Sequence, residues 1–544
     1  MRISTLRRSP RLVPVMGAGL LFFVLPVKHA HATSVTEFPD NGSEQMGRGG
    51  AWVARASDPL AAFYNPAGLA GQDTRVLAQA NINIAKTCFT RVKATNDASL
   101  DANVGPGQSF PQACSDGTPF PNPQLGFTYR LTPTVGLGFA VLGPAASGKM
   151  DWPDGLTAPQ RYLLTHANAL FFTPTLGIGV EVVPNLRLGA SFQWGIANLE
   201  LQNKSIALNA GDVAAGNGVS ASLNDVDATL KAKTFFVPGF TLGALWSASD
   251  AVDIAGWYKW SAPIDATGDV KSKYKTKNGD TAIANCGDDT DPTSTKCGSG
   301  DNAHVKVAVP MEAKLGVRFH KLRDGADPLH RRDPMSQDVF DAEIDLTWAN
   351  NSAFDNLQIR FPGAPDGSGI IPVPGTSGNL PPNADVPHHY RDVLGVRVGG
   401  DVNVLPDQLA LRAGVFYETS AQDKQYQNID FVGAWKMGLA LGGTYRIHFH
   451  KGDPEKKSAL ELSAGFGHVF VGEQNNNNPS AAGVAGLAGT ACNPATTGNT
   501  PGDNCVNPAT GQVTGQKYRT NWPVNLGTIT NSFNMINVGL AYRF

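Results

Sequence analysis

The chain has 544 residues and a formal net charge of −2, and 42% of its residues are hydrophobic, 8% aromatic and 17% charged. This near-neutral balance lacks the basic excess of nucleic-acid-binding proteins and argues against such a partner. Beyond the N-terminus, no run reaches the ~20 apolar residues that a transmembrane helix needs.

The N-terminus has the organisation of an export signal. Four arginines precede or begin an apolar stretch from Leu12 to Val27, and Ala30-His31-Ala32 has the small-x-small pattern of a cleavage site. This order predicts a signal peptide over residues 1–32. A single-span anchor is the alternative, and it is disfavoured because the apolar stretch is short and contains two prolines.

The stretch from Ser43 to Gln72 differs from the rest of the chain. Asp58-Pro59 and Asn65-Pro66 each combine a helix N-cap residue with a proline at the first helical position. Two short helices joined at Asn65-Pro66-Ala67 are too small to bury their own apolar side chains. We therefore expect this segment to sit inside a container formed by the remaining chain.

After residue 72, polar and apolar residues alternate with the period of a β-strand, as in the stretches 186–194, 340–348 and 409–417. A soluble β-sandwich would also alternate. However, the strands are ~9–11 residues or longer, aromatic residues lie at the ends of their apolar faces, and tight turns alternate with long polar loops. We count 14 strands, which begin near residues 75, 123, 135, 167, 186, 232, 251, 304, 338, 390, 408, 432, 457 and 530. The last strand ends at Phe544, as in bacterial barrels recognised by the barrel-assembly machinery.

The predicted fold is therefore an all-β membrane protein. It is a 14-stranded antiparallel transmembrane β-barrel with a small N-terminal helical hatch in its lumen. The tight turns lie near residues 132–134, 184–185, 249–250 and 406–407. The long loops, expected to be exposed outside the cell, lie near 93–122, 144–165, 204–228, 263–303, 350–388, 420–430 and 474–525.

Six cysteines occur in an exported chain, which favours disulfides over metal ligands. Their number permits 15 connectivities. We favour nearest neighbours because each pair would then close one loop: Cys88–Cys114, Cys286–Cys297 and Cys492–Cys505.

Four segments resemble the FadL/TodX family of outer-membrane transporters for long-chain fatty acids and aromatic hydrocarbons. The first is MGRGGAWVARASDPLAAFYNPAGLAG at 46–71, in which Asn65, Pro66 and Ala67 match the hatch motif of that family. The others are the stretches 151–194, 405–420 and 539–544. The resemblance covers the mature chain in order, with large loop insertions that include the cysteines.

The resemblance implies three parts: a signal peptide at 1–32, a latch and hatch at 33–74, and a barrel at 75–544. By analogy, Thr33, Ser34 and Val35 begin a latch over residues 33–38 that reaches into the binding pocket. The third strand, 135–143, would form a lateral gate, and Gly136 and Gly138 would tolerate a kink there.

The function expected from this resemblance is passive transport of hydrophobic small molecules, foremost long-chain fatty acids, with lateral release. An aromatic hydrocarbon importer and a non-transporting adhesive barrel are the alternatives. The expected location is the outer membrane of a Gram-negative bacterium, as a monomer in contact with lipid and lipopolysaccharide. We expect no cofactor, no metal and no enzymatic activity.

Motifs that would indicate other chemistry are incomplete. The stretch 143–149 imitates a phosphate-binding loop, but Met150 replaces the Ser or Thr that would bind Mg²⁺. The acidic stretch 288–295 lacks the spacing of a calcium loop, and His388-His389 has no partner ligands at metal-binding spacing. Arg161, Arg187, Arg397, Arg412 and Lys436 are candidates to face the lumen, where inward charges are ordinary in barrels.

Overall fold

The computed structural model describes residues 40–97, 104–143, 148–154, 158–207, 224–276, 297–326, 333–361, 384–449, 458–480, 483–487, 504–506, 513–516 and 519–544. Residues 1–30 form a separate unit outside this description, and the fold below belongs to the unit 31–544. The expected signal peptide and latch therefore lie outside the described residues.

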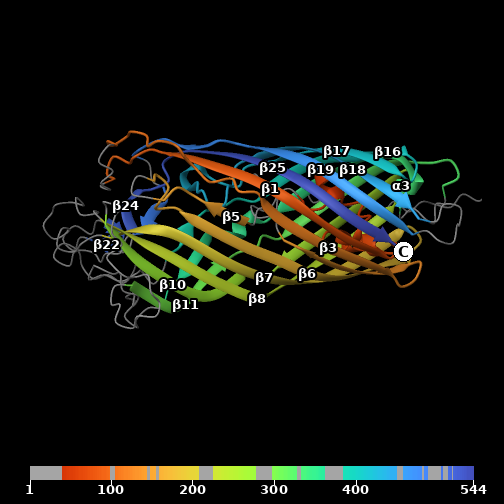
Figure 1. Ribbon diagram of the computed structural model, residues 1–544, viewed down its shortest axis with the longest axis horizontal. Coiled ribbons are helices and arrows are strands. Elements are labelled where there is room, and N and C mark those ends of the chain that lie inside the picture. The colour runs from red at the N-terminus through yellow and green to blue at the C-terminus, as the bar shows by residue number, and fades with distance from the viewer. Residues whose placement is uncertain are drawn as a thin grey trace, which may run out of the picture. The chain divides into compact units, whose positions relative to one another are not determined.

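Within the described residues, 14 antiparallel strands form a closed barrel (Figure 1). The ring closes because β25 pairs with β1 along the whole length of β1, from Arg75↔Arg543 to Arg91↔Gly527. In ring order the strands are β1 (Arg75–Arg91), β3 (Phe120–Arg130), β4 (Val135–Leu142), β6 (His166–Val183), β7 (Leu186–Ala207), β8 (Asn224–Ser247), β9 (Val252–Ser261), β12 (Glu312–Leu322), β13 (Asp338–Ala349), β16 (Val393–Leu405), β17 (Leu409–Glu418), β18 (Lys436–His448), β19 (Ala459–Val471) and β25 (Gly527–Arg543).

The two faces of the wall have opposite polarity. Large apolar side chains point outward and are exposed, as for Leu315 (66%), Leu346 (60%) and Leu441 (63%), while charged residues on the same strands are buried inside. A soluble β-sandwich would bury its apolar face instead, so this arrangement identifies a lipid-facing surface. Among the described residues, no helix combines the length and hydropathy of a membrane span.

The tight turns lie where the sequence predicted them, between β3 and β4, β6 and β7, β8 and β9, and β16 and β17. Asn185 and Asp407 adopt positive φ angles of 72° and 57°, a conformation that Asn and Asp tolerate in turns. One wall strand was misplaced. Residue 304 falls in β11 (Cys297–Val307), and the eighth strand of the wall is β12, because Pro310 cannot donate to a ladder and separates the two.

Several stretches predicted to be loops contain strands that pair with the wall strands or with one another. These are β2 (Ala113–Cys114), β5 (Gly148–Asp151), β10 (Ile264–Thr276), β11, β14 (Asn356–Arg360), β15 (Val386–Pro387) and β20 (Gln474–Asn476). β7 and β8 also continue into the expected loop 204–228. Two small sheets pair β21 (Ala485–Leu487) with β24 (Arg519–Pro523) and β22 (Asn504–Val506) with β23 (Val513–Gln516). β22 and β24 lie at the opposite end of the barrel from the C-terminus (Figure 1).

The segment from residue 40 to residue 72 lies inside the barrel, and we call it the hatch. It contains α1 (Ser43–Gly47) and two short 3₁₀ helices, η1 (Pro59–Ala62) and η2 (Pro66–Leu69), where two short helices were expected. Asp58 and Asn65 cap the turns by accepting hydrogen bonds from the backbone N–H of Leu60 and Ala67. Elsewhere in the described residues, one-turn helices are α3 (Pro334–Gln337), η4 (Asn351–Ala353) and η5 (Lys424–Tyr426).

Candidate functional site

Ion pairs attach one side of the hatch to the wall. The guanidinium of Arg48, which is 0% exposed, lies 2.6 Å from Asp341, 2.7 Å from Asp401 and 3.1 Å from Glu343. Burial alone would lower the pKa of Arg48, but these carboxylates raise it above its ordinary value. Arg55 pairs with two of the same carboxylates, Asp341 and Asp401. Hatch cations and wall carboxylates of β13 and β16 thus form one buried network.

Backbone groups of the hatch join this network. The N–H groups of Trp52 and Val53 donate to the Asp345 carboxylate at 2.8 and 3.2 Å, and Ala54 N–H donates to Glu343 at 2.6 Å. Acidic side chains on β13 therefore pair with the hatch cations and also accept hydrogen bonds from hatch N–H groups. A buried segment without regular secondary structure needs such partners for its backbone N–H groups.

The opposite side of the hatch rests on glycines. A Cβ atom at Gly136 would overlap the carbonyl of Leu69, and one at Gly189 would overlap the backbone of Pro66. Gly138 faces the Leu69 side chain in the same way. Gly136 and Gly138 lie in regular register with β6, opposite Gly179 and Gly177. In this structure, the two glycines proposed for a strand kink give the hatch room to approach β4.

The Asn65-Pro66-Ala67 motif lies where the hatch meets the wall, against Gly189 and Gly243. The Asn65 side chain donates to the carbonyl of Val53 at 2.8 Å and accepts from Ala67 N–H, so it joins two parts of the hatch. Aromatic and aliphatic hatch residues pack in one apolar cluster with wall residues that include Leu77, Leu142, Leu245 and Trp257. The motif holds the hatch in its folded shape.

Two separate strands pair with the same edge of β6, and we call the place between them, where residues 144–147 lie outside the description, the interruption. Both β4 and β5 pair with β6, but β4 ends at Leu142 and β5 begins at Gly148. On its other side, β4 pairs with β3 only from Leu125 to Arg130 within the described residues. The carbonyl of Gly143, at the start of the interruption, accepts hydrogen bonds from Asn122 (3.2 Å) and from the hatch residue Asn41 (2.5 Å).

A cavity of about 170 Å³ adjoins this interruption. Phe120 and Gly148, which flank the interruption, belong to its lining. Most of the other residues that line the cavity are aliphatic or aromatic, and they come from β1, β6, β7, β8, β10, β11, β14 and β25. They include Ala85, Ala169, Leu199, Leu201, Leu230, Val270, Val305, Ile359 and Phe533. Much of this lining belongs to stretches that the sequence analysis assigned to exposed loops and did not connect with function.

Few charges reach the cavity. Among its described lining residues, Lys149 is the only cation, and Asp116 and Asp430 are the anions. Lys149 forms an ion pair with Asp151, and its side chain is 48% exposed. Asp430 accepts from Phe431 N–H at 2.7 Å and lies 3.0 Å from His388 Nε2. The lining thus carries no excess of positive charge.

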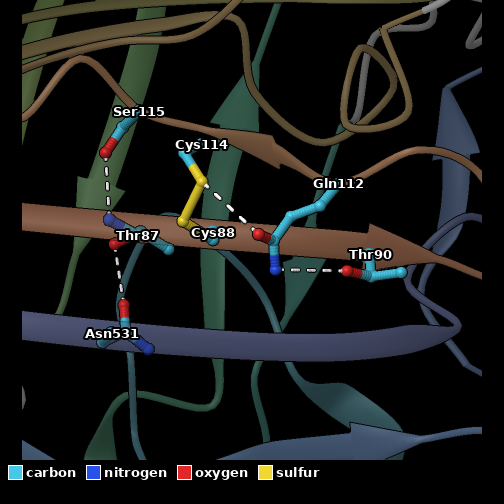
Figure 2. The surroundings of a disulfide bond; sticks show 7 residues. All are labelled: Thr87, Cys88, Thr90, Gln112, Cys114, Ser115 and Asn531. Carbon is cyan, nitrogen blue, oxygen red and sulfur yellow. Dashed lines mark hydrogen bonds between the residues drawn. A yellow bond between two sulfur atoms is a disulfide. The ribbon is translucent and has the colours of Figure 1, made fainter.

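A disulfide joins Cys88 on β1 to Cys114 on β2, the residue before Ser115 (Figure 2). Next to it, Ser115 N–H donates to the carbonyl of Thr87 at 2.8 Å, and Thr87 N–H donates to Ser115 Oγ at 3.0 Å. Ser115 and Asp116 begin the segment that lines the cavity. The disulfide therefore fixes this segment against β1. The other two expected pairs involve side chains outside the described residues.

The other polar candidates have structural contacts. Arg397 pairs with Glu418 at 3.1 Å, Arg412 lies 3.3 Å from Asp401, and Arg187 donates to Ser247. Lys436 is buried on β18 inside the barrel, and the Arg161 guanidinium lies over the ring of Tyr162. None of the five lines the cavity. In the part of the chain that the structure describes, no group of three His, Cys, Asp or Glu side chains is arranged to hold a metal.

A closed ring of strands with an apolar exterior, a hatch in the lumen and an apolar cavity define a plugged outer-membrane barrel. The chain belongs to the family described as "Outer membrane protein transport protein (OMPP1/FadL/TodX)", whose model matches residues 28–500. Members are Gram-negative outer-membrane transport proteins rather than enzymes, and this protein is accordingly an outer-membrane channel for hydrophobic compounds.

Solved structures share this fold. A Pseudomonas aeruginosa FadL homologue matches with a TM-score of 0.60 at 18% identity, over 94% of this chain and 99% of that chain. The P. putida toluene transporter TodX matches with a TM-score of 0.53 at 14% identity, over 94% of this chain and 99% of that chain. The CymD monoaromatic hydrocarbon channel matches with a TM-score of 0.53 at 12% identity, over 92% of this chain and 97% of that chain. No curated protein matches the sequence.

Proposed function

We propose that the protein carries small, uncharged hydrophobic compounds passively across the outer membrane by binding them in this cavity. The cavity is the observation that carries this proposal. It is lined mainly by aliphatic and aromatic side chains, and Phe120 of β3 and Gly148 of β5 belong to its lining. Each methylene group that leaves water for such surroundings contributes ~0.8 kcal/mol, so a hydrophobic solute prefers this route to an aqueous channel.

The proposed exit is the wall interruption between β4 and β5. Phe120 and Gly148, which flank this place, also line the cavity, so a bound ligand would lie next to the proposed exit. Asn41 and Asn122 hold Gly143 at its edge, so a movement of the hatch would release one of the two bonds to this carbonyl. A ligand leaving here would enter the bilayer directly.

Size and charge support a single-ring neutral ligand. A 150 Å³ apolar cavity is large enough to bind benzene, and this cavity measures about 170 Å³. A fatty-acid carboxylate would meet two lining carboxylates and one lysine that already has an ion-pair partner. Burying an anion without a free cation is costly.

Long-chain fatty acids are the second candidate, and the expectation that they are the main substrate stays a prediction. The half-exposed ammonium of Lys149 favours it, because an arriving carboxylate could replace Asp151 as its partner.

The test is uptake of labelled toluene and labelled oleate by cells that lack their own transporter, with and without this protein. Ala169→Trp would fill the cavity, and the matched control Ala190→Trp places the same side chain on the outer face of β7. We expect toluene uptake that Ala169→Trp abolishes and Ala190→Trp preserves. Selective oleate uptake would favour fatty acids. Uptake of neither compound by folded protein would favour the adhesive barrel.

The remaining expectations are part of this proposal. The latch, from Thr33, Ser34 and Val35 to Phe38, lies outside the described residues, and its removal should change ligand affinity without unfolding the barrel. Contacts with lipopolysaccharide and the barrel-assembly machinery, the monomeric state, and a gate role for β4 are likewise proposals.

A further inference from the structure

The polar groups that line the cavity are mostly occupied. Ser115 Oγ accepts from Thr87 N–H, Thr118 donates to Asp116, and Asn428 Oδ1 accepts from Ile429 N–H at 2.7 Å. Asp430 and Lys149 have the partners described above. These groups already have hydrogen-bond partners when no ligand is bound, so they contribute little to ligand selectivity.

Ser205 differs from these residues. It lies on β7 and lines the cavity, its side chain is 2% exposed, and its hydroxyl has no hydrogen-bond partner in the described part of the protein. A buried hydroxyl without a partner is unfavourable in the empty protein, and a ligand that supplies the partner removes this disadvantage. Leu201 and Asn203 lie on the same face of β7 as Ser205 and also line the cavity. Along this face the lining therefore changes from apolar at Leu201 to polar at Asn203 and Ser205.

The edge of the wall interruption has the same uncharged polar character. Asn83 lines the cavity, and Asn122 on the neighbouring β3 holds Gly143. Gln124, two residues further along β3, is fully buried, and its Oε1 atom has no hydrogen-bond partner among the described residues. A neutral donor or acceptor on the ligand would find amide groups on this path, whereas an ionised group would find no opposite charge among these three residues.

We propose that the preferred ligand is a single aromatic ring with an uncharged hydrogen-bonding substituent, such as a phenolic hydroxyl, which pairs with Ser205. This inference rests on the proposed function and narrows its substrate class. A site that offers a buried polar group discriminates against the analogue that lacks the matching group, because that polar group is then left unpaired. A phenol, with a pKa near 10, is neutral at pH 7.

The test compares equilibrium binding of p-cresol and toluene, which differ by one hydroxyl, to the purified full-length protein at pH 7. We expect p-cresol to bind about tenfold more tightly than toluene. Ser205→Ala should bring this ratio close to one while toluene affinity stays unchanged, and Ser205→Thr, which keeps the hydroxyl, should retain the preference.

The matched control is Ser191→Ala. Ser191 lies on the same strand, and its hydroxyl is also buried without a hydrogen-bond partner in the described residues, but it does not line the cavity. This variant should keep the wild-type ratio. Equal affinities for the two ligands in the wild type, or a preference that survives in folded Ser205→Ala, would overturn the inference and leave the proposed function intact. Binding of neither ligand would overturn both.

Discussion

Replacing Arg48 tests whether ion pairs hold the hatch in place. Arg48→Met removes a fully buried guanidinium from Asp341, Asp401 and Glu343, whereas the strand pairings of the barrel stay intact. Breaking a buried pair by removing one partner costs ~3–5 kcal/mol. We take about 3 kcal/mol from this range because Asp341 and Asp401 keep their contacts with Arg55. The population with an undocked hatch should then rise by ~10²-fold.

The assay is ion conductance of the purified protein in planar bilayers, since a barrel with an undocked hatch would admit water and ions. We expect rare openings in the wild type and frequent openings in Arg48→Met. Arg360→Met is the control for loss of an arginine ion pair, because Arg360 on β14 pairs with Asp385 and neither residue belongs to the hatch. Equal conductance in the wild type and in Arg48→Met, with both shown to be folded by heat-dependent gel mobility, would refute the reasoning.

Two further predictions concern the hatch. Gly136→Ala places a methyl group against the Leu69 carbonyl, and overpacking of ~1–3 kcal/mol should raise conductance by about 5- to 150-fold. Gly467→Ala, whose new atom would lie 3.8 Å from its nearest neighbour, should not raise it. Burial, followed by the charge of Glu44, raises the pKa of Asp58 to about 7 from 3.8. The docked hatch therefore binds this proton more tightly, and its docking should weaken as the pH rises from 5 to 8. Asp58→Asn should remove that trend in protease accessibility of the hatch, and a trend that persists would contradict the assignment.

The wall and the hatch were largely predictable because their signals are local. Period-two alternation and turn residues such as Asn185 and Asp407 place the strands, and the caps Asp58 and Asn65 place the hatch turns. The prediction failed at the eighth strand, where β11 and β12 have similar alternation. Only the pairing of β12 with β9, a tertiary contact, shows which of the two continues the wall.

The cavity could not be predicted because distant segments build it. Ser205, Val270 and Ile359 come from stretches whose polar composition indicates exposed loops. In the structure these stretches are strands because β7 pairs with β8, β10 with β11, and β11 with β14. The run Asn203-Lys204-Ser205 has no apolar alternation, and its inward face is set by the strand it pairs with. The amount of Ser and Asn in such a stretch does not reveal which hydroxyl is buried.

The ion pairs of the hatch lie on one part of the wall. They hold the hatch on β13 and β16, whereas close glycine contacts occur both there, at Gly399, and on β4 and β7, at Gly136 and Gly189. If the proposed exit is correct, a small displacement next to β4 would open a path toward the bilayer while the ion pairs keep the lumen blocked. A bacterium that makes this protein would then take up scarce hydrophobic nutrients without becoming more sensitive to water-soluble antibiotics or bile salts, which need a continuous aqueous passage.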